Sequence, residues 1–147
     1  MNAAARYLAV VSLAVWIGGL TLYALVVIPV GTDIIGGTEQ GFITQRVTGW
    51  LNWIGVASLA ILVLTLRARW MLATWGTLAV TLAILFALHL RLDALLDGRA
   101  REIADASTFY NWHRAYLIVT AAQWLAGAVH LWGVVQSTST TLPASVT

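Results

Sequence analysis

YLAVVSLAVWIGGLTLYALVVIP, residues Tyr7–Pro29, is the stretch that decides the fold. It runs for 23 residues without an Asp, Glu, Lys, Arg or His. A helix needs about 20 apolar residues to cross a hydrocarbon core about 30 Å thick. The stretch is also longer than the roughly 7–15 apolar residues of a secretory signal peptide. We therefore expect a retained transmembrane helix that ends at Pro29, because proline lacks the backbone N–H that a helix needs.

Three further stretches are long and apolar enough to span a bilayer: Val47–Leu66, Met71–Leu96 and Phe109–Val135. The connections between the last three stretches are short, which makes neighbouring helices antiparallel. The sequence thus predicts an all-α fold, a four-transmembrane-helix antiparallel bundle over residues 1–135. Residues 136–147 are rich in Ser and Thr, and they are predicted to form a flexible polar tail.

The composition excludes several classes of protein. The chain has 147 residues, of which 60% are hydrophobic and 10% are charged, whereas roughly a quarter of an ordinary soluble domain is charged. That excludes a soluble globular enzyme and a disordered chain. All eight basic residues are Arg, but they form no positive run that could follow a phosphate backbone. The absence of Cys excludes disulfides and thiolate metal sites. The expected partner is the lipid bilayer, with no nucleic acid.

The sequence also predicts where helices end and where two helices can approach closely. Gly98 is predicted to stop the third helix, and Ser107 is predicted to be the N-cap of the fourth. Small residues that permit close helix contact occur in the first and fourth spans: Ala14, Gly18, Gly127 and Gly133. These contacts could lie inside the bundle or form a dimer face.

Six polar residues are predicted to lie in one layer near one end of the bundle. In an antiparallel hairpin, residues at equal depth are equally far from the turn. By that count His89 is level with Arg114 and within one residue of His113. The same count places Arg46 level with Arg91. The layer comprises Arg46, His89, Arg91, Asp93, His113 and Arg114.

Ionisable groups inside a transmembrane span are energetically costly, so their presence in this layer needs an explanation. Two interpretations are open. In the functional one, His89 and His113 present imidazoles across the hairpin of helices three and four. They could ligate haem iron or a Cu or Zn ion, with Asp93 as a further ligand or as a partner of an imidazole. In the other, the layer is a satisfied polar cluster, and Arg91 and Arg114 extend to the headgroups.

His130 cannot share a cofactor with His113, since about 25 Å of helix separates the two residues. It is expected to lie near the opposite interface and to bond to a neighbouring carbonyl. A ligand or proton relay shared with Gln123, seven residues earlier on the same face, is the alternative. Asn52 is expected to make a hydrogen bond between helices.

Several short motifs resemble those of CopD-like membrane proteins. They are Val15–Leu20 with Tyr23 and Val26–Pro29 in the first span, Asn52–Gly55 in the second, and Phe109–Arg114 with Gln123–Gly127 in the fourth. The similarity covers nearly the whole chain and is strongest to an uncharacterised family in that group. It implies a four-helix integral membrane protein.

A more distant similarity is to the haem-dependent bacterial protoporphyrinogen oxidase. His89 matches a histidine in the third helix of that family, and Phe109–Tyr110 matches an aromatic pair in its fourth. The histidine that the family carries in its first helix is replaced here by Ala9. The resemblance implies haem b as a cofactor, but not the oxidase activity.

Three functions follow from these observations. The first is a membrane protein that binds haem b or a transition metal ion between helices three and four. The second is an accessory or structural subunit without a cofactor, which packs against a membrane-protein partner or another copy of itself. The third is a small transporter or proton-conducting element that uses Arg46, Arg91 and Asp93.

The expected location is a bacterial cytoplasmic membrane, crossed several times, with both termini on the same side. We place that side in the cytoplasm because the tight turn between spans two and three carries Arg67 and Arg69.

Overall fold

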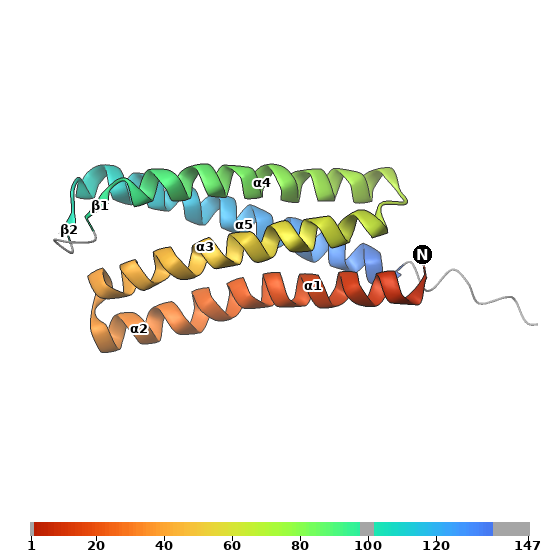
Figure 1. Ribbon diagram of the computed structural model, residues 1–147, viewed down its shortest axis with the longest axis horizontal. Coiled ribbons are helices and arrows are strands. Elements are labelled where there is room, and N and C mark those ends of the chain that lie inside the picture. The colour runs from red at the N-terminus through yellow and green to blue at the C-terminus, as the bar shows by residue number, and fades with distance from the viewer. Residues whose placement is uncertain (1, 98–101, 137–147) are drawn as a thin grey trace, which may run out of the picture.

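The computed structural model describes residues 2–97 and 102–136 of the chain, and these residues are almost entirely helical (Figure 1). The helices are α1 (Ala3–Leu22), α2 (Ile28–Ile35), α3 (Gly37–Leu62), α4 (Arg69–Asp93) and α5 (Ala106–Gln136). A π-helical turn, Tyr23–Val27, joins α1 to α2, and a 3-10 turn, Val63–Thr65, follows α3. The strands β1 (Leu96–Asp97) and β2 (Glu102–Ile103) pair antiparallel between α4 and α5.

The predicted all-α fold with four spans is confirmed. Within the described residues, four continuous helical segments are long and apolar enough to cross a membrane: Ala3–Ile35, Gly37–Thr65, Arg69–Asp93 and Ala106–Gln136. Large apolar side chains are exposed on the outside of all four segments, for example Leu25, Trp53, Val80 and Trp132. In water such a surface would be unstable, whereas acyl chains solvate it. The chain is therefore a multi-pass integral membrane protein whose outer surface contacts the lipid bilayer.

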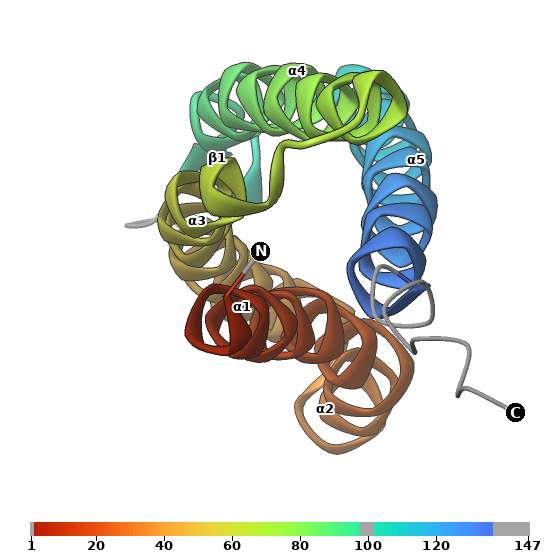
Figure 2. The same ribbon diagram turned by 90° about the vertical axis from the view of Figure 1, so that its right-hand side faces the viewer.

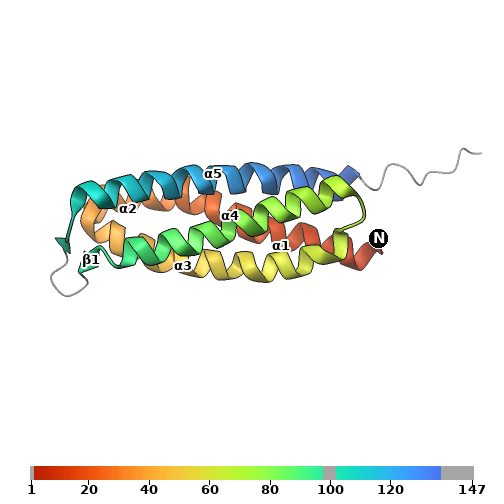
Figure 3. The same ribbon diagram turned by 90° about the horizontal axis from the view of Figure 1, so that it is seen from above.

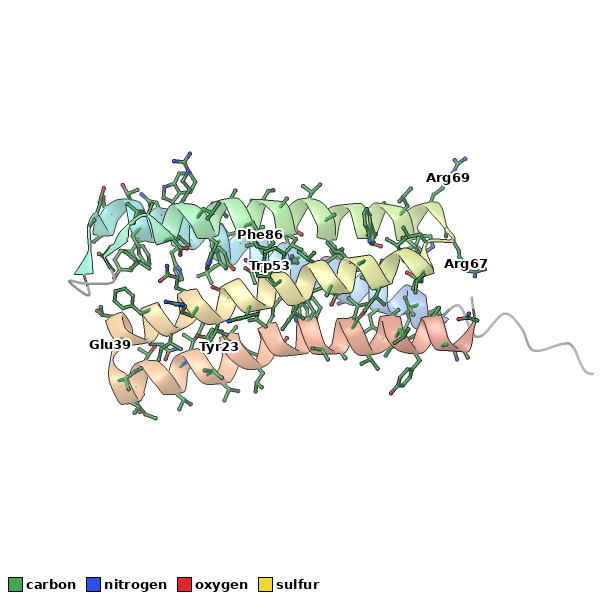
Figure 4. All side chains as sticks on the ribbon, viewed as in Figure 1. Tyr23, Glu39, Trp53, Arg67, Arg69 and Phe86 are labelled. Carbon is green, nitrogen blue, oxygen red and sulfur yellow. The ribbon has the colours of Figure 1, made fainter. Side chains whose placement is uncertain are left out.

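The four spans form a ring. Viewed along the bundle axis, α1 lies between α3 and α5, and α4 lies opposite α1 (Figure 2). Figure 3 shows the same helices running antiparallel along the length of the bundle. The start of α1, the end of α5 and the turn with Arg67 and Arg69 share one end, whereas Glu39 marks the other (Figures 1 and 4). The side of the membrane that each end faces remains a prediction.

The expected end of the first helix at Pro29 is wrong. The chain stays helical to Ile35, and the turn occurs at Gly36, whose φ of 84° favours glycine. A proline in a helix removes one hydrogen bond and crowds the carbonyl four residues earlier, here that of Leu25. The π-helical turn widens the backbone just before Pro29, and the N–H of Ile28 reaches back to the carbonyl of Tyr23. Such a turn accommodates proline without ending the helix.

Other predicted boundaries also differ, and the second span begins at Gly37 rather than at Val47. The third span ends at Asp93 rather than Leu96, because Leu96 pairs with Ile103 in the short hairpin. Ser107 is not the N-cap of α5. Asp105 takes that role, since its carboxylate accepts hydrogen bonds from the Thr108 amide at 3.1 Å and from the Ser107 hydroxyl at 2.9 Å. Gly98 and residues 137–147 of the predicted tail lie outside the described residues.

Glycines let the helices approach closely inside the bundle. A Cβ atom at Gly55 of α3 would lie 2.6 Å from the indole of Trp16, and one at Gly133 of α5 would lie 1.7 Å from the indole of Trp70. At Gly127 the nearest atom would be the Ile17 side chain, 2.8 Å away. Two of the small residues noted in the sequence, Gly127 and Gly133, thus serve contacts within the bundle.

We predict that Gly55→Ala destabilises the protein by about 1–3 kcal/mol, because the added methyl group overlaps the Trp16 indole. The matched control is Gly18→Ala in α1, where a Cβ would meet nothing within 4 Å. That change should leave stability unchanged or raise it by about 0.5–1 kcal/mol, since alanine favours a helix over glycine. Thermal unfolding of the detergent-purified variants measures both, and equal midpoints would contradict the packing described here.

The cap of α5 makes a second, pH-dependent prediction. Hydrogen bonds from Thr108 and Ser107 hold the pKa of Asp105 below its usual value of 3.8. A lowered pKa in the folded state means that the carboxylate stabilises the fold above pH 3.8, and that this contribution is lost as the pH falls through the lower folded value. Asp105→Ala should therefore lower the unfolding midpoint at pH 7, and the difference from the parent should shrink in strong acid. A constant difference at every pH would argue against the cap.

Candidate functional site

The six residues of the predicted polar layer come from three helices at the end of the bundle that Glu39 marks. Arg46 is on α3, whereas His89, Arg91 and Asp93 are on α4, and His113 and Arg114 are on α5. Side-chain contacts fix the register of α4 against α5, for example between Thr74 and His130. That register sets His89 near the level of Arg114, as expected. Depth alone, however, does not decide which side chains meet.

His89 faces α3. Its Nε2 atom lies 3.7 Å from the Asp93 carboxylate, one turn further along α4. The same atom would be 3.4 Å from a Cβ at Gly49, so the glycine lets the imidazole approach the α3 backbone. The Gln45 amide donates a hydrogen bond to the other oxygen of Asp93. The pair of His89 and Asp93 therefore links α4 to α3.

A groove of about 1070 Å³ lies between α3 and α4 around this pair. Its ionisable lining residues are Glu39, Arg46, His89 and Asp93. Its aromatic lining residues are Phe42, Trp50 and Trp53. Trp53 packs edge-on against Phe86 of α4, with ring centroids 5.5 Å apart, between the two helices (Figure 4). The groove is thus amphipathic, with charged groups and broad aromatic faces side by side.

His113 has different surroundings. Its ring is half-buried and stacks on Phe109, one turn earlier on α5, with centroids 5.9 Å apart and planes 9° from parallel. The face of α4 that meets α5 at this end is apolar, since Leu85, Leu88 and Leu92 form one buried cluster with Tyr116. The contacts of His89 and of His113 therefore lead to different neighbours, and a site made of both imidazoles stays a prediction.

The arginines of the layer are exposed: Arg46, Arg91 and Arg114. Among the residues that the structure describes, no group of three or more His, Asp or Glu side chains is placed to hold a metal ion. The carboxylate of Asp93 and the imidazole of His89 are the pair that the fold does bring together.

His130 is fully buried near the end of the bundle that carries Arg67 and Arg69, and its partners are side chains. Its Nε2 atom is 3.0 Å from the hydroxyl of Thr65, and its Nδ1 atom is 2.8 Å from the hydroxyl of Thr74. Both hydroxyls also lie within hydrogen-bonding distance of a backbone carbonyl of their own segment. His130 thus joins the ends of three spans. The expected bond to a carbonyl is wrong, because threonine hydroxyls fill both positions around the ring.

The larger feature that sequence reasoning missed is a polar column along the bundle interior. On α3 and the turn after it, buried or half-buried polar side chains share one face: Gln40, Thr44, Thr48, Asn52, Ser58 and Thr65. On α5 the buried face carries Tyr116, Gln123 and His130, at intervals of seven residues. The sequence contains a signal for the α5 part of this column, since residues seven apart lie on nearly the same helix face.

Hydrogen bonds tie the column together at the end that Glu39 marks. The Tyr23 hydroxyl donates to the Thr44 hydroxyl at 3.1 Å, and the Gln40 amide donates to the Tyr23 oxygen at 3.3 Å. These bonds join the π-helical turn to α3. The Tyr116 hydroxyl approaches Thr48 and Asn52 from α5.

Comparison of the chain with family models, with curated proteins and with solved structures found no match.

Proposed function

We propose that this integral membrane protein binds a flat amphipathic molecule in the groove between α3 and α4, with haem b as the candidate and His89 as its ligand. The observation that carries the proposal is the position of His89. Its imidazole lines the groove, and the adjacent carboxylate of Asp93 is itself held by Gln45.

The arrangement of His89 and Asp93 supports a role for His89 as a ligand of iron. A ligating histidine commonly has its second ring nitrogen near a carboxylate, which fixes the tautomer and raises the basicity of the ring. Asp93 lies beside Nε2 and favours a proton there. That leaves the lone pair of Nδ1 to bind a metal.

The rest of the groove suits a porphyrin. Trp50 and Trp53 expose most of their indole surface, which offers flat apolar contact. The exposed guanidinium of Arg46 could form bidentate hydrogen bonds to a carboxylate, such as a haem propionate. Bound haem would supply a redox-active iron. The protein would supply the imidazole, the planar contacts and the charge that orients the macrocycle.

A bare transition metal ion is supported less well than haem. Such an ion takes most of its ligands from the protein, whereas a porphyrin brings four nitrogen ligands of its own. His89 and Asp93 offer two protein donors. This proposal keeps the haem expected from the resemblance to the haem-dependent oxidase, which itself remains a proposal, but relocates it from α4 and α5 to α3 and α4.

The absorption spectrum of the purified protein tests the proposal. Protein made with an ample haem supply, or titrated with hemin afterwards, should show a Soret band. His89→Ala should abolish the band, whereas His113→Ala, the matched change on α5, should retain it. Loss of the band in both variants would instead support the two-imidazole site. A colourless parent protein that co-purifies with a fixed partner would overturn haem binding in favour of an accessory subunit.

Asp93→Asn should keep haem binding but weaken it, because the amide supports the imidazole less well than the carboxylate does. Loss of such a partner typically costs about 10–100-fold in affinity. Hemin titration followed by absorbance measures the change. Arg91→Gln, on an exposed side chain outside the groove lining, is the control and should bind like the parent. An unchanged affinity in Asp93→Asn would remove Asp93 from the site.

A further inference from the structure

Among the described residues, three side chains in the middle of the bundle have buried polar atoms outside hydrogen-bond geometry with any protein group, one of them on Asn52, which the Tyr116 hydroxyl approaches. They are Nε1 of Trp16, Nδ2 of Asn52, and both Nε2 and Oε1 of Gln123. Trp16 and Gln123 are 0% exposed and Asn52 is 2% exposed. An unpaired polar atom in an apolar interior is costly, and a surrounding bilayer offers no water from the side. Such a set of atoms requires a partner.

The first two of these side chains meet at the contact between α1 and α3. The indole of Trp16 packs directly over Gly55, with its Nε1 atom 2.8 Å from where a Cβ would be. Asn52 lies three residues before Gly55 and therefore presents its side chain on the same face of α3. Both N–H groups thus belong to one region of the interior.

Gln123 reaches this region from α5. One turn after it, Gly127 packs against Ile17, the neighbour of Trp16. Two turns before it, Tyr116 on the same face approaches Asn52 and Thr48. Contacts on both sides of Gln123 therefore lead to the residues around Trp16 and Asn52, and from these contacts we infer that its buried amide belongs to the same part of the interior.

The two ends of this region differ. Toward the end that carries Arg67 and Arg69, the interior holds large apolar side chains with almost no exposed surface, Leu13, Leu62 and Leu78, as well as the buried pair of Thr65 and His130. Toward the other end, the polar column continues through Thr48 and Thr44 to Gln40 and Tyr23. A polar guest could therefore enter from that end, along hydroxyl and amide groups.

We propose that Trp16, Asn52 and Gln123 line an internal polar binding site that holds a cluster of ordered water molecules. The lining groups present three N–H donors and one carbonyl acceptor, and all of them are uncharged. Water accepts and donates, so it satisfies this set without placing an ion in a region of low dielectric constant. The site is separate from the groove at His89, and haem binding could fail without affecting it.

Nuclear magnetic resonance in nanodiscs tests the site directly. The indole Nε1–H of Trp16 should show a cross-peak to water, because water is its partner. The control is Trp75, whose indole donates to the carbonyl of Leu59 at 3.0 Å and should show none. Trp16→Phe and Trp75→Phe assign the two signals. A Trp16 indole without a water cross-peak in the folded parent would overturn the proposal.

Gln123→Met gives a second test that does not require the Trp16 variant to fold. If the amide were unpaired and dry, its removal would raise the unfolding midpoint. With water bound, the same change removes bonds that hold the cluster and should lower the midpoint. Gln136→Met, the same substitution at an exposed position at the end of α5, should leave the midpoint unchanged. A raised midpoint in Gln123→Met would overturn the hydrated site.

Discussion

A hydrocarbon core offers no hydrogen-bond partner, and this constraint shapes the interior of the bundle. Every backbone group within a span must bond along its own helix, and every polar side chain must find a partner inside the protein. Hydroxyls such as those of Thr81 and Thr120 meet the demand by donating to carbonyls of their own helix. Longer side chains meet it across helices, as Tyr23 does with Thr44 and His130 does with Thr65 and Thr74.

The same constraint explains why uncharged polar side chains of α3 lie inside the bundle, beside the buried Leu51 and Leu62. Asn52 and Ser58 are buried, whereas Trp50, Trp53 and Val56 are exposed to the lipid. A soluble helical bundle has the reverse pattern, since water solvates its outer charges. Polar side chains reduce the apolar area that the interior buries, and close packing of the helices compensates for that reduction. At Gly55 and Gly133 the indoles of Trp16 and Trp70 fill the space that a side chain would occupy, which draws α1 toward α3 and the start of α4 toward α5.

The number and order of the spans could be predicted from the sequence, because hydropathy and length alone specify them. The boundaries could not. Pro29 predicts the end of a helix because proline lacks a backbone N–H. Its actual effect depends on whether the preceding backbone can widen. Nothing in the sequence of Tyr23–Val27 indicates a π-helical turn. Asp105 and Ser107 are both good caps, and which of them caps α5 depends on where the hairpin before it ends.

The candidate site shows a similar division. The register of the α4–α5 hairpin could be counted from its turn, so the depth of His89 was predictable. Its neighbour was not, because depth does not fix the rotation of a helix about its axis. Leu85, Leu88 and Leu92 take the face toward α5, which turns His89 toward Gly49 of α3. Part of the column on α5 could be predicted from the sequence, because the spacing of Gln123 and His130 places them on one helix face. Its continuation to Tyr116 and Asn52 could be recognised only in the structure.

Helix α3 therefore borders two regions of opposite character. Its outer side carries Gln45 and Trp53 toward the charged groove at His89, and its inner side carries Thr48 and Asn52 toward the uncharged column. The position of the groove depends on α3, and the bonds from Tyr23 to Thr44 and from His130 to Thr65 hold α3 and the turn after it near both ends. His130 also contacts Thr74 of α4, so a ligand that moves α4 against α3 must work against the bonds of His130 to both Thr65 and Thr74.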